Sequence, residues 1–283
     1  MHILLSNDDG LFAPGLHALY DVLVDEGGRL GGPLGGDGDD RGVFVVAPLT
    51  MQSATSHGVT FHEPLMVRQE KVSPRLSGIS VDGRPADCVK LALSTLWPER
   101  FGADTLPELL ISGMNAGANC GLYVVYSGTV AAALEGAFLG IPSISVSLHI
   151  GEQRPRFDVA ARHARRVIEE ILLHGLNAHE CLSINLPVTE EEGPLPPVRV
   201  CPMNLHGSVD HYEKRVSPAG DVYYWPAQNH FAFHGTDTGS DVELLFQRFI
   251  TVTPLRYDLT QHHQIQTWQK KLESLRRGAE GTS

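Results

Sequence analysis

The sequence predicts an α/β protein with a Rossmann-like, doubly wound and mostly parallel sheet, and the start of the chain shows why. The apolar run at residues 3–5 has the length of a buried strand, and it stops in a turn-forming cluster at residues 7–10. A helical pattern opens at Pro14, which suits a first helical turn because its missing N–H is harmless there. Strand, acidic turn and helix in this order begin an α/β unit, and ligands bind where such strands end.

Two more runs, at residues 43–48 and 109–111, are read as buried strands of the same sheet. The loop after the first run contains Ser53, and the stretch after the second combines glycines with Asn115 and Asn119. In a doubly wound sheet the loop with Ser53 emerges at the same edge as the acidic turn. Hydroxyl groups in such loops are usually turn formers, although one of them could also be an oxygen ligand for a hard cation.

The remaining elements follow from helical spacing of apolar residues and from strand propensity. The expected helices cover residues 15–26, 85–96, 159–173 and 261–277. The expected strands cover residues 78–83, as one side of a hairpin, and residues 144–148, 182–185, 198–200 and 222–225. The glycine-rich residues 27–38 are read as a surface loop, because glycine has the largest backbone entropy cost and no ordered phosphate-binding fingerprint is present.

Composition excludes several classes of function. The formal net charge of −11 argues against a general electrostatic footprint for a nucleic-acid polymer. No apolar stretch approaches the length of a membrane span, and the N-terminus lacks a signal-peptide pattern. The cysteines are scattered and form no Cys-x-x-Cys pair, which favours reduced thiols in a cytoplasmic protein over disulfides or a cysteine zinc site. They are Cys88, Cys120, Cys181 and Cys201.

The adjacent carboxylates of Asp8 and Asp9 are the first candidate for chemistry. Two neighbouring carboxylates repel each other, and removing them from water is costly unless a cation compensates. A solvated turn that only caps the following helix is the competing interpretation, because acidic residues often serve turns and caps. The residues alone leave both interpretations open.

A second candidate lies at Ser127-Gly128-Thr129, before an alanine-rich run that propagates a helix well. Ser127 and Thr129 are good capping residues, and capping alone would explain them. A helix N-terminus with free N–H groups and hydroxyls is also a ready phosphate site. The position of this segment after a central strand and beside a glycine- and asparagine-rich loop favours the phosphate interpretation.

Taken together, these motifs resemble the survival protein E (SurE) family of metal-dependent phosphatases that act on nucleoside monophosphates. The resemblance rests on residues 6–10, 13–15, Ser53, 112–119, 126–130 and 135–136, and it extends through residues 85–89, 184–187, 235–237 and 250–255. It covers nearly the whole chain in order. It implies hydrolysis of nucleoside 5′-monophosphates, with 3′-monophosphates and short polyphosphates as further candidate substrates.

The resemblance also implies roles for particular residues. One divalent cation per subunit, Mg²⁺ or Mn²⁺, would be bound by oxygen atoms, as these hard cations prefer, from Asp8, Asp9, Ser53 and Asn115. The phosphate would face Asn119, Ser127, Gly128 and Thr129. Asp8 is expected to orient or deprotonate the attacking water, while Asn119 and Ser127 stabilise oxygens that gain charge in the transition state.

Residues 1–283 are expected to form one domain, with the α/β core in residues 1–190 and a projecting hairpin and C-terminal helix in residues 191–283. The resemblance implies a homodimer or homotetramer that exchanges these C-terminal elements. Four histidines lack clean metal-ligand spacing and are read as surface or hydrogen-bonded residues. They are His206, His211, His230 and His234.

The chain departs from the usual family pattern at residues 49–52, at Ala54, at Arg84 and at residues 122–123, and the glycine-rich residues 27–38 look like an insertion. These departures put base preference and access to the pocket in doubt. A dinucleotide-dependent oxidoreductase lacks support because no Gly-x-Gly-x-x-Gly follows the first strand. A non-catalytic nucleotide- or metal-binding regulator remains the alternative.

Overall fold

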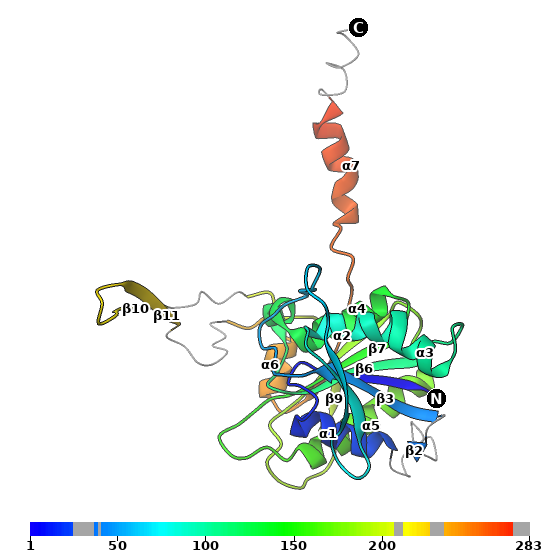
Figure 1. Cartoon of the computed structure of the whole chain (residues 1–283). Helices are drawn as coiled ribbons and strands as arrows, with labels where there is room; N and C mark the ends of the chain where they lie inside the picture. Colours follow the sequence, from blue (N-terminus) through cyan, green and yellow to red (C-terminus); the bar gives the residue numbers. More distant parts are fainter. Residues whose placement is uncertain (25–36, 39–40, 207–211, 227–234, 274–283) are drawn as a thin grey trace.

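The computed structural model describes residues 1–24, 37–38, 41–206, 212–226 and 235–273. Its centre is one large, mostly parallel sheet with helices on both faces, which confirms the predicted α/β class (Figure 1). The strands lie in the order β4 (Val67–Lys71), β5 (Ser77–Val81), β3 (Arg41–Pro48), β1 (Ile3–Ser6), β6 (Leu109–Ala116), β7 (Ser143–Leu148), β8 (Cys181–Leu186), β12 (Ile250–Leu255) and β9 (Val198–Val200). The short β2 (Asp37–Gly38) pairs with β3.

The strands that flank the expected site are all parallel to one another. β1 pairs with β3 on one side and with β6 on the other, and β7 and β8 continue the parallel run. Antiparallel pairing occurs toward the edges, where β4 joins β5 as the expected hairpin and β12 joins β8. The carboxyl ends of the central strands therefore meet at one edge of the sheet.

The core consists of two layers, one on each face of the sheet (Figure 1). Helices α1 (Pro14–Val24) and α5 (Phe157–His174) cover one face, where they pack on Ile3 and Leu5. Helices α2 (Pro85–Leu91) and α4 (Gly128–Phe138) cover the other face, where they pack on Leu4. Successive side chains of a strand point to opposite faces, so a strand buried on both faces reads as an uninterrupted apolar run.

Two expected elements differ in extent from the prediction. The helix expected at residues 85–96 ends as α2 at Leu91, continues as a π-helical turn, Ala92–Leu96, and then becomes α3 (Trp97–Phe101). The strand expected at residues 109–111 continues as β6 to Ala116, through residues that were read as a loop. Gly113 permits this extension, because a Cβ at that position would lie 2.3 Å from the Val146 carbonyl oxygen on β7. Glycine here serves a close approach between strands.

The C-terminal third carries elements that project from the body (Figure 1). β10 (Tyr212–Val216) and β11 (Val222–Pro226) form an antiparallel hairpin whose residues are all exposed. Helix α7 (His262–Lys271) contains no buried residue. It lies within the helix predicted at residues 261–277, and residues 274–277 of that prediction lie outside the described residues. The shorter elements are the 3₁₀-helix η2 (Gly121–Tyr126) and α6 (Asp241–Phe246).

Three further expectations from the sequence concern the glycine-rich segment, the cysteines and membrane-spanning helices. Most of the glycine-rich segment lies outside them, and its last two residues form β2 rather than a loop. The four cysteines are all buried and free. Among the helices of the described residues, none combines the length and the apolar composition that a membrane crossing requires.

Candidate metal and phosphate site

The expected site lies at the carboxyl ends of β1 and β6, which are neighbours in the sheet. From β1 the chain passes to α1 on one face, whereas from β6 it passes to α4 on the other face (Figure 1). Two neighbouring strands whose connections leave in opposite directions open a crevice between them, and this crevice is where open α/β sheets bind ligands. The acidic turn, Asn115 and the start of α4 all lie at this position.

The turn after β1 is held by Asn7, a residue that sequence reasoning did not single out. Its side-chain amide donates to the Gly10 carbonyl oxygen at 2.9 Å, and its Oδ1 accepts from the Gly10 N–H at 3.2 Å. Gly10 has a φ of 97°, a conformation that glycine adopts without steric cost. Asn7 is fully buried, so this ring of hydrogen bonds fixes the two residues that it encloses, Asp8 and Asp9.

Asp8 is 6% exposed and contacts the first turn of α4. Its Oδ1 accepts a hydrogen bond from the Thr129 hydroxyl. Gly128 allows this approach, because a Cβ there would lie 2.9 Å from the Asp8 Cβ. Burial raises the pKa of Asp8 to about 6, and the neighbouring charge of Asp9 adds to the rise, whereas the bond from Thr129 opposes it. A cation bound nearby would therefore favour the ionised form of this carboxylate.

Asp9 connects the acidic turn to the end of β6. Its Oδ2 accepts from the Ala116 N–H at 2.9 Å, and burial raises its pKa while this hydrogen bond opposes the rise. The neighbouring Asn115 donates from Nδ2 to the Gly117 carbonyl oxygen at 2.8 Å. That bond orients the amide and leaves its oxygen as a possible ligand atom.

Ser53 is exposed and lies in the loop between β3 and β4. The residue before it, Gln52, donates its N–H to the Asp8 carbonyl oxygen at 2.8 Å. The Gln52 N–H attaches the Ser53 loop to the Asp8 carbonyl oxygen, and the Ala116 N–H attaches the Asn115 segment to the Asp9 side chain. The structure brings all four expected cation ligands to one edge of the sheet.

Asn119 is held by two residues on neighbouring strands. Its N–H donates to Asn185 Oδ1 at 2.8 Å, and Asn185 Nδ2 donates back to the Asn119 carbonyl oxygen at 3.0 Å. Its side-chain amide donates to Ser147 Oγ at 2.9 Å. Asn185 and Ser147 were not predicted as site residues. They lie in register with each other on β7 and β8, in strands that carry other polar residues as well, so the sequence gives no local signal that sets them apart.

The start of α4 agrees with the predicted helix start. Ser127 is the N-cap, and its Oγ accepts the Val130 N–H at 3.1 Å. Thr129 is fully buried and its hydroxyl donates to Asp8, and its expected contact with a phosphate stays a prediction. Ser127 is also buried, and its side chain already serves as a cap.

The donor set fits a hard divalent cation. The carboxylates of Asp8 and Asp9 accept the hydrogen bonds given above, and a carboxylate that accepts such bonds can also offer oxygen to a cation. With the oxygens of Asn115 and Ser53, this set suits Mg²⁺ or Mn²⁺ better than zinc. Groups of three or more His, Cys, Asp or Glu side chains suited to a metal are absent from the described part of the chain, and the expected set contains only two such residues.

Of the four histidines considered in the sequence, His206 lies within the described residues. His206 is exposed and its Nδ1 lies 3.2 Å from Asp237 Oδ1. His211, His230 and His234 lie outside the described residues.

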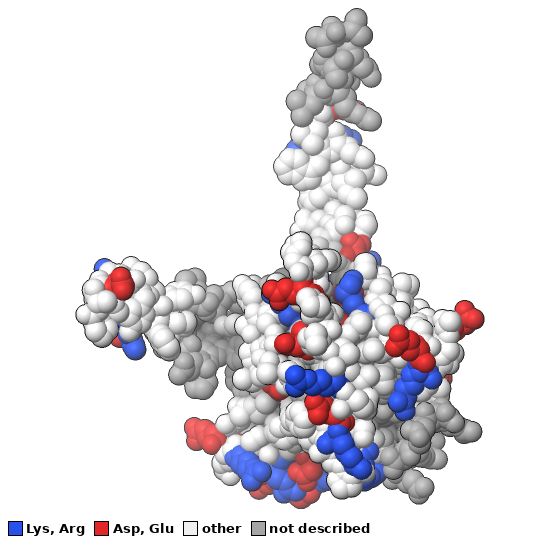
Figure 2. Space-filling view, in the orientation of Figure 1, with Lys and Arg blue, Asp and Glu red and all other residues white. Residues whose placement is uncertain are grey.

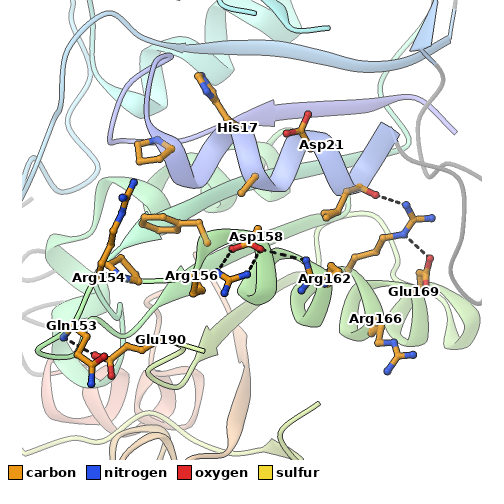
Figure 3. A pocket seen from close by; sticks show the side chains of 16 residues that line it. His17, Asp21, Gln153, Arg154, Arg156, Asp158, Arg162, Arg166, Glu169 and Glu190 are labelled. Carbon is orange, nitrogen blue, oxygen red and sulfur yellow. Dashed lines mark hydrogen bonds and ion pairs between the residues drawn. The ribbon is translucent and has the colours of Figure 1, made fainter. Parts of the chain in front are cut away.

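A groove of about 1220 Å³ between α1 and α5 contains none of the expected site residues (Figure 3). Several of its arginines are paired with carboxylates, for example Arg156 with Asp158 at 2.8 Å and Arg165 with Glu169 at 2.8 Å. Figure 2 likewise shows basic and acidic side chains interspersed on the visible face of the body. Mixed charge of this kind does not form a surface for a polyanion.

Comparison with known proteins gives a consistent result. The family model described as survival protein SurE matches residues 3–208. The 5′-nucleotidase SurE of Desulforudis audaxviator is 38% identical over 273 residues, which are 95% of this chain and 97% of the relative. The 5′-nucleotidase SurE of Heliobacterium modesticaldum is 39% identical over 271 residues, which are 94% of this chain and 90% of the relative.

The crystal structure of the SurE protein from Aquifex aeolicus is similar to this fold with a TM-score of 0.75 and 32% sequence identity. The similarity covers 95% of this chain and 99% of that one. Sequence and structure thus agree over almost the full length of the protein. On these grounds the chain belongs to the survival protein SurE family.

Proposed function

We propose that this protein is a 5′-nucleotidase that hydrolyses nucleoside monophosphates to nucleoside and phosphate with the help of one divalent cation. The observation that carries the proposal is the contact between Asp8 and the first turn of α4, which places a buried carboxylate beside a helix N-terminus at the crevice between β1 and β6. The names of the relatives, 5′-nucleotidase SurE, support the reaction class.

The cation would be held by the oxygens of four residues, Asp8, Asp9, Ser53 and Asn115. Bound there, it would supply neutralisation of the phosphoryl charge and a lower pKa for a bound water. Asp8 is the residue that we expect to orient that water or take its proton. The hydrogen bond from the Thr129 hydroxyl to Oδ1 of Asp8 would hold the carboxylate in orientation for this role.

The phosphate would lie against the N-terminal turn of α4 and the Asn119 loop. The partial positive charge of a helix N-terminus stabilises oxygens that gain charge in the transition state. The Asn119 amide has two N–H donors, one of which is bonded to Ser147, and the second remains for the substrate. Asn185 keeps the Asn119 backbone in place through its two hydrogen bonds.

We further propose a homodimer or homotetramer assembled through the hairpin β10–β11 and α7. Support comes from the apolar side chains that α7 leaves exposed, Ile265, Trp268 and Leu272, and from the aromatic residues of β11. A chain shortened before α7 should dissociate in light scattering after size exclusion, whereas an unchanged mass would contradict this assembly. The four buried free cysteines support a reducing, cytoplasmic location.

The function is tested by phosphate release from a panel of nucleoside 5′- and 3′-monophosphates and short polyphosphates. The protein is first treated with a chelator, and Mg²⁺ or Mn²⁺ is then added. Wild type is compared with Asp9→Ala and with Asp104→Ala, which removes an exposed carboxylate between α3 and β6 as a control.

We expect metal-dependent release from wild type and from Asp104→Ala, with a loss of at least two orders of magnitude in Asp9→Ala, because oriented metal ligands and electrostatic stabilisation are worth ~10²–10³-fold. Absence of release from every substrate, with metal still bound, would favour the non-catalytic regulator instead.

A further inference from the structure

The loop that carries Ser53 holds a backbone conformation that needs support from its surroundings. Residues 49–66 consist of bends, turns and irregular backbone, without a helix or a strand. Ala54 and Ser56 adopt φ values of 55° and 56°, in the left-handed region that residues other than glycine seldom occupy. Such conformations persist only where neighbouring groups impose them. Ser53 lies directly before this pair, so whatever holds the loop also places the Ser53 hydroxyl.

Several contacts hold the loop to the body, in addition to the bond from the Gln52 N–H to the Asp8 carbonyl oxygen. Ser56 donates its N–H to the Tyr126 carbonyl oxygen at 3.0 Å, and Thr60 donates its hydroxyl to Asp87 at 2.7 Å. Between them, His57 Nε2 lies 2.7 Å from Glu135 Oε2. Of these three contacts, that of His57 is the one that reaches α4, the helix whose first turn holds Asp8.

Glu135 is an unusual partner because its side chain is 6% exposed. Burial alone would raise its pKa, but hydrogen bonds and charges from His57 and Lys90 lower the pKa overall. The carboxylate is therefore ionised, and a buried ion requires partners. Lys90, on α2, supplies the second one at 3.3 Å. Glu135 is thus paired with both His57 and Lys90.

We propose that His57 is a positioning residue: its hydrogen bond to Glu135 holds the Ser53 loop against α4 and so presents the Ser53 oxygen to the cation. This rests on the proposed function, in which Ser53 is a cation ligand. A single rigid helix then fixes both sides of the cation site. Thr129 in its first turn orients Asp8, and Glu135 further along holds the loop that carries Ser53.

The chain offers a matched control for this idea. His57→Ala removes the tether but leaves Glu135 paired with Lys90, so the buried carboxylate keeps a cationic partner. Lys90→Ala removes the other partner of the same carboxylate but leaves the tether intact. The two variants alter the same carboxylate, and only the first releases the loop. His57→Gln keeps a side-chain donor and serves as the conservative rescue.

The experiment measures Mn²⁺ binding to the full-length protein without substrate, by isothermal titration calorimetry. We expect His57→Ala to weaken Mn²⁺ affinity about tenfold, in the range found when residues that orient metal ligands are removed. Lys90→Ala should stay within about twofold of wild type, and His57→Gln should recover most of the affinity. In phosphate release, His57→Ala should need more Mn²⁺ for half-maximal rate yet reach a similar kcat at saturation.

Unchanged Mn²⁺ affinity in His57→Ala would overturn the positioning role, and so would an equal loss in His57→Ala and Lys90→Ala, since the charge around Glu135 would then be the cause. If the role of His57 were merely structural, His57→Ala would lower thermal stability, and kcat at saturating Mn²⁺ would fall together with Mn²⁺ affinity. Failure of the proposed function gives a different result: wild type would bind no Mn²⁺, or would bind it without releasing phosphate.

Discussion

The hydroxyl of Thr129 donates a hydrogen bond to the carboxylate of Asp8, and this bond joins the start of α4 to the end of β1. The N-terminus of α4 therefore already faces one anionic group. A phosphate at the same helix end would meet the negative charge of Asp8, and the two anions would repel each other unless a cation lay between them. Helix and cation are thus two parts of one site, and neither suffices for phosphate binding without the other.

The first prediction concerns the stability of the metal-free protein. Burial raises the pKa of Asp8 from 3.8 to about 6, so the folded state binds the Asp8 proton more tightly than the unfolded state does. Ionisation of Asp8 therefore opposes folding above pH 6, by an upper limit of about 3 kcal/mol at 1.36 kcal/mol per pKa unit. Asp8→Asn should raise the free energy of unfolding of the chelated protein by about 1–3 kcal/mol at pH 7.5.

The pH dependence of this gain provides its control. Well below the unfolded pKa of 3.8, Asp8 is protonated in both states, and the difference between the variant and wild type should vanish. Urea unfolding of both proteins at a pH of about 2.5 and at pH 7.5, in the presence of a chelator, measures this difference. Saturating Mg²⁺ should then stabilise wild type and leave Asp8→Asn unchanged. If Asp8→Asn were less stable than wild type at pH 7.5, the ionised Asp8 would not oppose folding, and the prediction would be wrong.

The second prediction uses Gly128, which gives Asp8 the space to approach α4. In Gly128→Ala the new Cβ would lie 2.9 Å from Asp8 Cβ and 3.0 Å from Pro85 Cγ, so Asp8 must shift. We expect a loss of about 1–3 kcal/mol in stability from overpacking, and a loss of roughly 10²-fold in kcat/KM because a displaced catalytic group loses its alignment. Gly193→Ala is the control, since a Cβ there meets nothing within 4 Å. Equal activity of the two variants would refute the prediction.

The third prediction concerns Asn185, whose side chain satisfies both backbone groups of Asn119. Asn185→Ala leaves that N–H and that carbonyl without the side-chain partner, and unsatisfied buried groups cost about 1–3 kcal/mol each. We expect lower stability in urea and a larger fall in kcat than in Mn²⁺ affinity, because Asn119 belongs to the phosphate side of the site. A variant in which Mn²⁺ binding fails first would place Asn119 on the cation side instead.

Much of the fold could be predicted from local signals along the sequence. The acidic turn after residues 3–5 and the N-cap at Ser127 both lie where expected, because a strand that stops in turn formers and a helix that begins at a serine are coded within a few residues. The extension of β6 to Ala116 was missed, because its cause is not local. It depends on how closely Gly113 can approach β7.

The same distinction applies to the candidate site. Asp8 and Asp9 follow a strand and could be found from the sequence pattern. The partners that orient the site residues are distant in sequence: Thr129 is 121 residues from Asp8, and Asn185 is 66 residues from Asn119. Only the folded sheet brings such pairs together, so a single sequence indicates which residues could react but not which residues hold them.

The last prediction concerns a row of buried hydroxyls beneath the site. Ser6, Ser112, Ser145 and Ser183 lie in register on four adjacent parallel strands, and their Oγ atoms have no hydrogen-bond partner within the described residues. A hydroxyl removed from water without a partner opposes folding. Ser145→Ala should therefore be neutral or stabilise the protein by up to about 1 kcal/mol.

Ser143 provides the comparison, because it lies on the same strand but its Oγ donates to the Ile141 carbonyl oxygen at 2.8 Å. Ser143→Ala should lose about 1 kcal/mol, since it removes a buried hydrogen bond of that net value. Urea unfolding at a fixed pH measures both variants, and an unchanged denaturant slope shows that the unfolded states are comparable. A loss in Ser145→Ala as large as that in Ser143→Ala would mean that the Ser145 hydroxyl is bonded in solution, and that the row contributes to holding the sheet together beneath the site.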